Sequence, residues 1–162
     1  MTADIYGVDR SSWPAGPWDF EAEDRLEWRD AATRLPCLMV RNGRGAWCGY
    51  VGMPPGHPLH GVSYHDARDQ DGAWIDEAHG GLTYSAACDG HICHVPQPGE
   101  PEDAWWLGFD CGHAGDHVPA LASTSYGRYR DVAYVKEKVT RLAQILVDGK
   151  PDAARWDVPC PG

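Results

Sequence analysis

The densest group of reactive side chains lies in one short run, Asp110-Cys111-Gly112-His113-Ala114-Gly115-Asp116-His117. It follows an apolar stretch, so we expect a strand to deliver these groups into a glycine-containing turn. Asp110, His113 and Asp116 are three residues apart and would share one face of a helical turn. We expect them to act as metal ligands or acid–base groups, with His113 the most important. The alternative is a structural turn capped by Asp110.

A second candidate catalytic residue is His79, which opens the run His79-Gly80-Gly81-Leu82-Thr83-Tyr84. Two glycines let a backbone approach a ligand closely. An imidazole titrates near neutral pH, so His79 is a candidate general base opposite the aspartates. The alternative is a strand entry with a glycine bulge.

The spacing of cysteines and histidines predicts a metal site, with zinc the favoured ion. His113 and His117 are four residues apart, which lets two imidazoles reach one ion, and Cys111 adds a soft ligand. Cys88 belongs to a second run, Cys88-Asp89-Gly90-His91-Ile92-Cys93-His94. A Cys88–Cys93 disulfide and buried free thiols are competing interpretations.

Other side chains are candidates for binding a ligand. Two guanidinium groups just before the last predicted helix would suit a phosphate or a carboxylate. Trp105 and Trp106 are neighbours on a predicted strand and therefore point to opposite faces, so one belongs to the core and the other can cover the site or stack on a flat ligand. The candidate ligand-binding residues are His57, Tyr84, Trp106, Arg128 and Arg130.

The charge of the chain is unevenly distributed. All eight histidines lie between His57 and His117, together with eleven acidic residues and one basic residue, and this segment accounts for the whole net charge of −10. Such a segment suits a metal ion or a positively charged ligand, although solvated acidic loops would have the same composition. The net charge argues against general nucleic-acid binding.

The elements that must position these residues indicate an α+β fold. The 162 residues are enough for a single domain over 1–162, with an extended segment at 1–18. We expect a helix from Asp19 to about Leu35 and a second, long helix from about Asp131 to Asp148, whose apolar residues recur at three- and four-residue steps. Predicted strands lie at 37–40, 46–51, around 82–84, around 91–95 and at 104–109. We therefore expect an antiparallel sheet of about five strands with both helices on one face.

The sequence also limits the compartment and the class of protein. No apolar run approaches the length of a membrane span, and no secretory signal precedes the first elements, so we expect a cytoplasmic protein without a membrane partner. The commonest nucleotide-binding, metalloprotease and serine-hydrolase motifs are missing from the sequence. The oligomeric state is left open.

Several motifs resemble a group of small proteins of bacteriophages and their actinobacterial hosts. The resemblance rests on His79-Gly80-Gly81-Leu82-Thr83-Tyr84 and on the run from Trp105 to Asp116, and it covers roughly residues 46–147. It implies a context, because small phage accessory proteins often modify, bind or destroy host molecules, including nucleotide immune signals. It assigns no residue a role.

Three functions follow as hypotheses. The first is hydrolase-like chemistry in a His/Cys/Asp pocket centred on zinc, acting on a small phosphate- or amide-bearing ligand such as a nucleotide. The second is a protein that binds and sequesters such a ligand without turnover. The third is a structural protein whose Cys/His zinc site only stabilises the fold.

Overall fold

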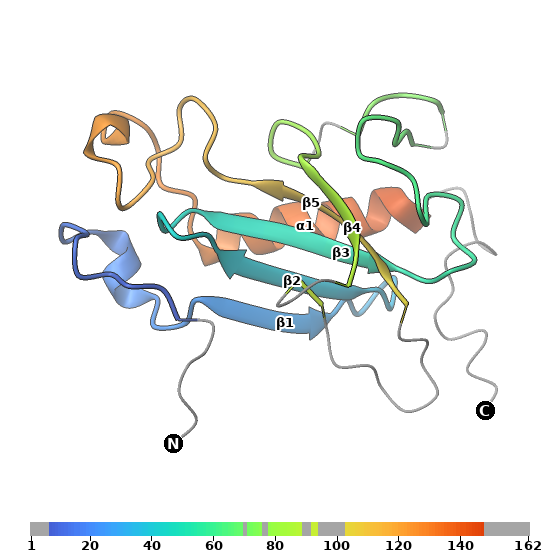
Figure 1. Cartoon of the computed structure of the whole chain (residues 1–162), viewed down its shortest axis with the longest axis horizontal. Helices are drawn as coiled ribbons and strands as arrows, with labels where there is room; N and C mark the ends of the chain where they lie inside the picture. Colours follow the sequence, from blue (N-terminus) through green and yellow to red (C-terminus); the bar gives the residue numbers. More distant parts are fainter. Residues whose placement is uncertain (1–6, 70, 76–77, 89–91, 94–102, 148–162) are drawn as a thin grey trace, which may run out of the picture.

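A single antiparallel sheet is the centre of the molecule (Figure 1). The computed structural model describes residues 7–69, 71–75, 78–88, 92–93 and 103–147. The strands lie in the order β1-β2-β3-β5-β4. Their bounds are β1 Arg25–Arg29, β2 Pro36–Arg41, β3 Trp47–Met53, β4 Tyr84–Ala87 and β5 Trp105–Asp110. The helical elements are two short 3-10 turns, η1 (Pro17–Phe20) and η2 (Ala122–Thr124), and the helix α1 (Val132–Val147).

The β2–β3 hairpin confirms the turn predicted from Asn42-Gly43. The side chain of Asn42 accepts hydrogen bonds from the backbone N–H groups of Arg44 and Ala46 at 3.0 and 3.1 Å. Gly45 has a φ of +96°, a conformation that an L side chain rarely adopts. Local turn chemistry therefore fixes the register of the two central strands.

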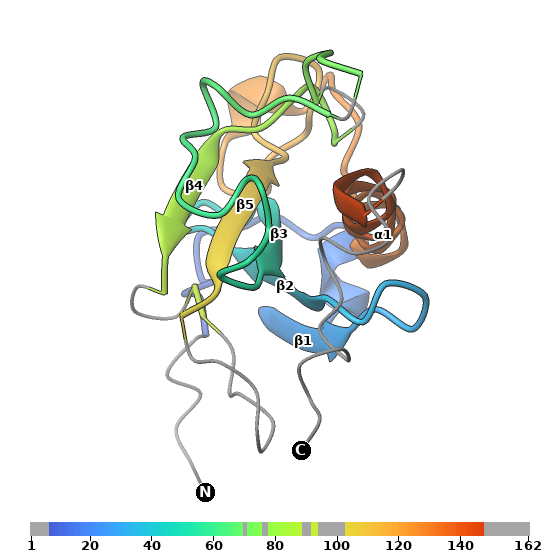
Figure 2. The ribbon, with the colours of Figure 1, turned by 90° about the vertical axis from the view of Figure 1, so that its right-hand side faces the viewer.

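The helix α1 covers one face of the sheet (Figure 2). Val135, Val139 and Leu142 are fully buried on it, as the apolar period predicts. An ideal Cβ on Gly49 of β3 would lie 2.6 Å from Cγ2 of Val139 and 2.6 Å from Cζ of Phe109. The absence of a side chain at Gly49 therefore lets α1 pack directly on the middle of the sheet.

The opposite face of the sheet is also buried. Leu38, Val40 and Trp106 are each at most 3% exposed, and by the strand register they lie on the face away from Gly49. Cys93 accepts a hydrogen bond from the Arg25 guanidinium at 2.7 Å through its carbonyl oxygen, which places this residue beside β1. Every residue of β3 is buried, because the strand is covered on both sides.

The predicted N-terminal helix over 19–35 is wrong. The segment instead forms η1 and then β1, in which Leu26 and Trp28 alternate toward the α1 face with the period of a strand. A turn follows, where the Asp30 carboxylate accepts hydrogen bonds from the N–H and the hydroxyl of Thr33, both at 2.8 Å. Pairing with β2 outweighs the helical composition of this segment.

The N-terminal segment is fastened to the sheet by a buried polar network. The Arg41 side chain is fully buried and pairs with Glu21 at 2.8 Å and with Asp24 at 3.1 Å. Glu21 also accepts hydrogen bonds from the Tyr129 hydroxyl and, at 2.8 Å, from the backbone N–H of Val132 at the start of α1. One carboxylate therefore joins the segment before β1 to the first turn of α1.

The remaining predicted elements divide into three outcomes. The strands predicted at 37–40, 46–51 and 104–109 and the last helix are confirmed by β2, β3, β5 and α1. The strand expected around 82–84 begins at Tyr84, and the one around 91–95 falls mostly outside the described residues.

Within the described part of the chain, no helix has the length and apolarity needed to cross a membrane.

Candidate functional site

Three segments that are distant in the sequence meet beyond the end of β5. They are the turn at 78–81, the loop at 111–117 and the residues 130–134 that lead into α1. Both loops lie on the same side of the molecule, with α1 behind the sheet (Figure 1). The antiparallel pairing of β4 with β5 brings the start of β4, which follows the 78–81 turn, beside the end of β5, which leads into the 111–117 loop.

Asp116 is the centre of a series of hydrogen bonds at this meeting point. Its Oδ2 lies 2.7 Å from Nε2 of His79 and accepts the backbone N–H of His113 at 3.0 Å. Its Oδ1 accepts the Nε–H of Arg130 at 2.9 Å. On the far side of the imidazole, Nδ1 of His79 lies 2.6 Å from the hydroxyl of Tyr134. The series therefore runs from Arg130 through Asp116 and His79 to Tyr134.

The protonation state of this series follows from its charges. Burial by itself raises the pKa of the Asp116 carboxyl, but hydrogen bonds from His79 and Arg130 outweigh burial and hold the pKa below its ordinary value. An ionised carboxylate only accepts, so Nε2 of His79 carries a proton. In the neutral imidazole Nδ1 is then an acceptor, and the Tyr134 hydroxyl donates to it.

Tyr134 keeps its proton unless His79 removes it. Burial raises the pKa of the Tyr134 phenol, and the nearby Arg130 charge only partly offsets that effect. The Arg130 guanidinium carbon lies 4.6 Å from the centre of the Tyr134 ring, and Nζ of Lys138 lies 5.4 Å from it. A phenolate formed by transfer to His79 would thus lie beside two cations.

The turn that carries His79 has an unusual backbone. His79 has a φ of 38°, and Gly80 and Gly81 follow with φ of 85° and 107°. A non-glycine residue at positive φ is uncommon and costs free energy. The turn is closed by the N–H of Gly81, which donates to the carbonyl of Ala78 at 3.0 Å. Three successive left-handed residues direct the imidazole inward, where its side chain is 9% exposed.

His113 and Asp110 form a second, more open pair beside the first. Nε2 of His113 lies 3.6 Å from Oδ1 of Asp110, too far for a hydrogen bond. Among the described residues, this nitrogen has no hydrogen-bond partner, although it is shielded from solvent. The rings of His113 and His79 are 5.5 Å apart. Asp110 itself accepts from the Gly112 N–H at 2.9 Å and the Thr83 hydroxyl at 3.2 Å.

An open groove of about 610 Å³ runs from His79 along the exposed side of α1. Arg130, Lys138 and Arg141 line it together with one acidic residue, Glu137. Arg130 is bonded to Asp116 through Nε alone, and its terminal amino groups make no hydrogen bond within the described part of the chain. The groove is thus basic in a chain whose net charge is −10.

The residues expected to hold zinc do not come together. Cys88 forms a disulfide with Cys93, which corrects its assignment as a ligand. Cys111 is buried, and burial raises the pKa of its thiol far above its ordinary value, which disfavours the thiolate that binds metals. The His117 ring packs edge-on against Trp18 at 5.1 Å. No group of three His, Cys, Asp or Glu side chains that could hold a metal ion converges among the described residues.

Most of the expected ligand-binding residues also lie elsewhere. Trp106 is fully buried in the core, which corrects its assignment to a ligand. Tyr84 packs edge-on against Tyr50 at 5.1 Å, and the Arg128 side chain is exposed outside the groove. His57 is buried, with Nε2 2.7 Å from the carbonyl of Leu146 near the end of α1 and Nδ1 accepting the Leu59 N–H at 2.9 Å.

Tyr134 and Lys138 are not among the site residues expected from the sequence. Both belong to the polar face of α1, where Tyr134, Lys138 and Arg141 follow at helical steps, and Arg130 precedes them by the same step just before the helix. That periodicity is a signal in the sequence, but the partner of Tyr134 lies 55 residues away along the chain. Only the folded arrangement of the two segments connects them.

No protein-family model matches the chain, and no curated protein and no solved structure matches it.

Proposed function

We propose that the protein hydrolyses a phosphoester of a small anionic molecule bound in the basic groove. The observation that carries the proposal is the hydrogen-bonded series Arg130–Asp116–His79–Tyr134, which forms one end of that groove. A carboxylate that orients an imidazole, which in turn contacts a hydroxyl, is the arrangement that activates a nucleophile.

The groove supports binding of a phosphate group. Arg130 uses one of its N–H groups on Asp116, and a guanidinium presents further donors in a planar fork that fits phosphate oxygens. Lys138 adds a second positive charge beside Tyr134. Both cations come from α1 or the residues that lead into it, so a rigid element sets their spacing.

The chemistry would proceed through Tyr134. Its oxygen attacks phosphorus while its proton passes to Nδ1 of His79, and Asp116 stabilises the imidazolium. The leaving-group oxygen takes that proton as its bond to phosphorus breaks. A water molecule then attacks the phosphorus of the phosphotyrosine and gives one proton to Nδ1 of His79. The Tyr134 oxygen takes this proton from Nδ1 as the bond between that oxygen and phosphorus breaks. The sum is ester plus water giving alcohol plus phosphate.

The test is release of phosphate from a panel of small phosphate monoesters in ¹⁸O-labelled water, followed by mass spectrometry. We expect one ¹⁸O atom in the released phosphate. Tyr134→Phe and His79→Gln should each lower kcat by about 10²–10⁴-fold. Tyr126→Phe is the matched control, because Tyr126 is 76% exposed and does not line the groove. Full activity in Tyr134→Phe would contradict the proposal.

A second candidate function is binding without turnover. It is favoured by the fact that both ring nitrogens of His79 already contact protein groups, so that the series also fastens three segments together. In that case the cations of the groove bind the anion and Tyr134 is a structural residue. Ligand recovered intact after the protein is denatured, with unchanged affinity in Tyr134→Phe, would favour sequestration over hydrolysis.

A further inference from the structure

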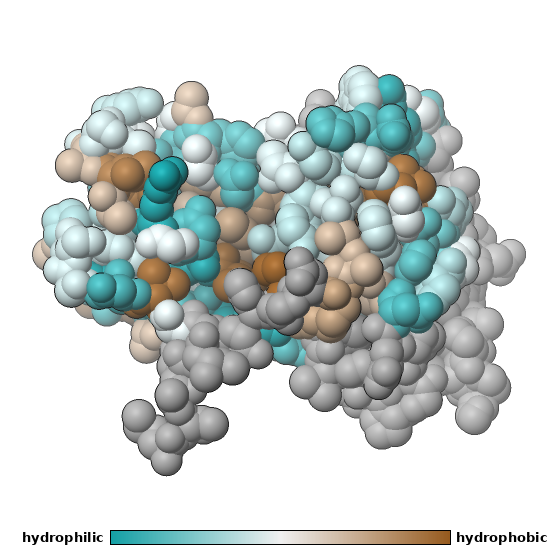
Figure 3. All heavy atoms as spheres, in the orientation of Figure 1, coloured by the Kyte–Doolittle hydropathy of each residue, from teal (hydrophilic) through white to brown (hydrophobic). Residues whose placement is uncertain are grey.

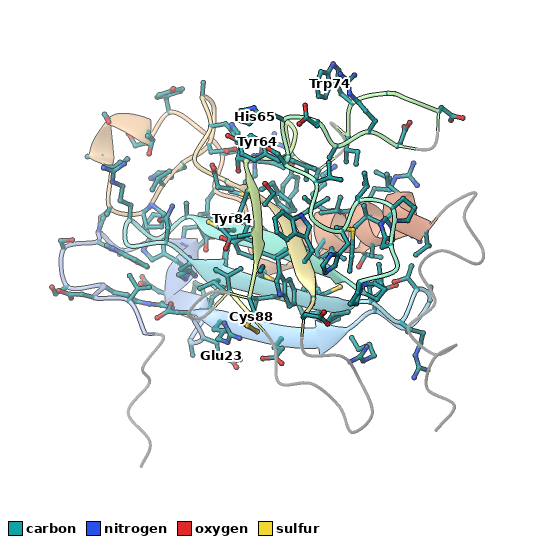
Figure 4. The ribbon with its side chains drawn as sticks, turned by 45° about the vertical axis from the view of Figure 1, so that its right-hand side comes forward. Glu23, Tyr64, His65, Trp74, Tyr84 and Cys88 are labelled. Carbon is teal, nitrogen blue, oxygen red and sulfur yellow. A yellow bond between two sulfur atoms is a disulfide. The ribbon has the colours of Figure 1, made fainter. Side chains whose placement is uncertain are left out.

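A second cavity lies on the other side of Gly80 from the basic groove. It has a volume of about 290 Å³, and Gly80 lines both cavities. Its walls are aromatic and apolar, and they include Tyr64, His65, Trp74 and Leu82. Figure 4 shows Tyr64, His65 and Trp74 gathered at one end of the molecule, far from Cys88 and Glu23.

The aromatic rings of this cavity are arranged for stacking. Trp74 is 54% exposed, which is unusual for an indole, and the Arg68 guanidinium lies 3.1 Å from its ring centre. The rings of Tyr64 and His65 are 4.1 Å apart and inclined by 31°. The backbone N–H of Tyr64 donates a hydrogen bond to the Ser85 hydroxyl of β4 at 2.9 Å, so the sheet supports the segment that carries these two rings. An exposed, cation-backed indole offers a planar ligand a large surface.

Gly80 is the one described residue that lines both cavities. Gly80 and Gly81 have no side chain to divide them, and both have positive φ, which strains other residues. A Cβ at Gly80 would lie 3.9 Å from the His113 ring, so even a small side chain would stand beside the site. A ligand that crossed Gly80 would have one end in each cavity.

From this arrangement we infer that the ligand is a phosphate joined to a planar aromatic ring, as in a nucleotide. The phosphate binds in the basic groove and the ring stacks in the cavity lined by Tyr64, His65 and Trp74. This inference rests on the proposed function for the phosphate end. The aromatic cavity is independent of that function, because none of its side chains belongs to the series around Asp116.

The test compares four kinds of probe by isothermal titration calorimetry on the full chain. They are the four 5′-nucleoside monophosphates, ribose 5-phosphate, inorganic phosphate and the corresponding nucleosides. We expect at least one nucleoside monophosphate to bind 10-fold or more tightly than ribose 5-phosphate. Trp74→Ala should remove that difference and leave the affinity for ribose 5-phosphate unchanged. Phe20→Ala is the matched control, because Phe20 is 92% exposed and lies outside both cavities.

The outcomes separate the two proposals. Equal affinity for ribose 5-phosphate and every nucleoside monophosphate overturns the inference and leaves the proposed function standing. Nucleosides that bind as tightly as their monophosphates overturn the proposed function and keep the aromatic cavity as a ring-binding site. Equal weakening of all phosphate compounds by Trp74→Ala shows a structural role for Trp74 and overturns the inference. No binding of any phosphate compound overturns both.

Discussion

Asp116 is a buried carboxylate to which several polar groups of the site are hydrogen-bonded. Its side chain is 2% exposed and it accepts three hydrogen bonds, from His79, Arg130 and the His113 backbone. Such a group fixes both the orientation of the imidazole and the tautomer in which Nδ1 accepts from Tyr134. The stability of the protein and the chemistry of the site therefore depend on the same ionisation.

We expect Asp116→Asn to lower the free energy of unfolding at pH 7 by about 1.5–3 kcal/mol, the range for hydrogen bonds to charged groups. The pKa of Asp116 lies below its ordinary value, so the folded state binds this proton less readily than the unfolded state. Its contribution is complete above about pH 4 and is lost as the pH falls through the folded pKa. Urea unfolding of both proteins between pH 3 and 7 measures this. A difference that is as large at pH 3 as at pH 7 would refute it.

His113 has a different character, because its side chain is 35% exposed and its backbone, rather than its ring, bonds to Asp116. We expect His113→Ala to impair ligand handling and to cost about 1 kcal/mol of stability. Val139→Ala, which opens a cavity under α1, should cost more, about 2 kcal/mol. Thermal unfolding of the two variants gives the comparison. If His113→Ala destabilises the protein as much as Val139→Ala does, His113 is a structural residue.

At the scale of elements, α1 has two faces with separate roles. Its apolar face packs on β2 and β3, and its polar face carries Tyr134 and Lys138 along the groove. Because the apolar face fits against Gly49 without a gap, the position of the polar face depends on that contact.

The Gly49 contact gives the element-scale prediction. Gly49→Ala places a Cβ within 2.6 Å of both Val139 and Phe109, so we expect a loss of about 1–3 kcal/mol from overpacking. Gly43→Ala is the control, because nothing lies within 4 Å of its Cβ, and its effect should stay within about 0.5 kcal/mol. Chemical denaturation measures both. Equal stabilities for the two variants would show that α1 shifts freely on the sheet.

The elements that the sequence reveals are those whose signal is local. The apolar period of α1 and the Asn42-Gly43 turn are complete within a few residues, and both are confirmed. The strand β1 has a helix-like composition, and its state is decided by β2, which lies several residues further along the chain. The same distinction holds at the site. His79, Asp116 and Arg130 could each be chosen by residue type, but Tyr134 depends on a contact that only the tertiary fold creates.

At the scale of the whole molecule, Glu21 joins the N-terminal segment to the strand and helix that support the site. Burial alone raises the pKa of Glu21, but hydrogen bonds from Tyr129, Val132 and Trp47 and the Arg41 charge hold it below its ordinary value. The carboxylate is therefore ionised at neutral pH, where it compensates the fully buried Arg41.

We expect Glu21→Gln to destabilise the whole protein by about 1.5–3 kcal/mol at pH 7, the range for hydrogen bonds to charged groups, because the buried Arg41 then keeps only Asp24 as an ionised partner among the described residues. Glu23→Gln is the matched control, since Glu23 is exposed two residues away, and it should change stability by less than about 0.5 kcal/mol. Differential scanning calorimetry of both variants tests this. A melting temperature for Glu21→Gln equal to that of Glu23→Gln would disprove the role of the network.

The contrast between the basic groove and the acidic chain has a consequence for the size of the ligand. At physiological ionic strength the Debye length is about 8 Å, so salt largely screens the interaction between exposed charges that are farther apart than this. A small anion seated beside Arg130 and Lys138 therefore responds chiefly to the groove, whereas a long polyanion must also approach the rest of a molecule whose net charge is −10. If the proposed function holds, electrostatic range alone would favour short phosphate compounds over long ones, and added salt would narrow the difference in affinity between them.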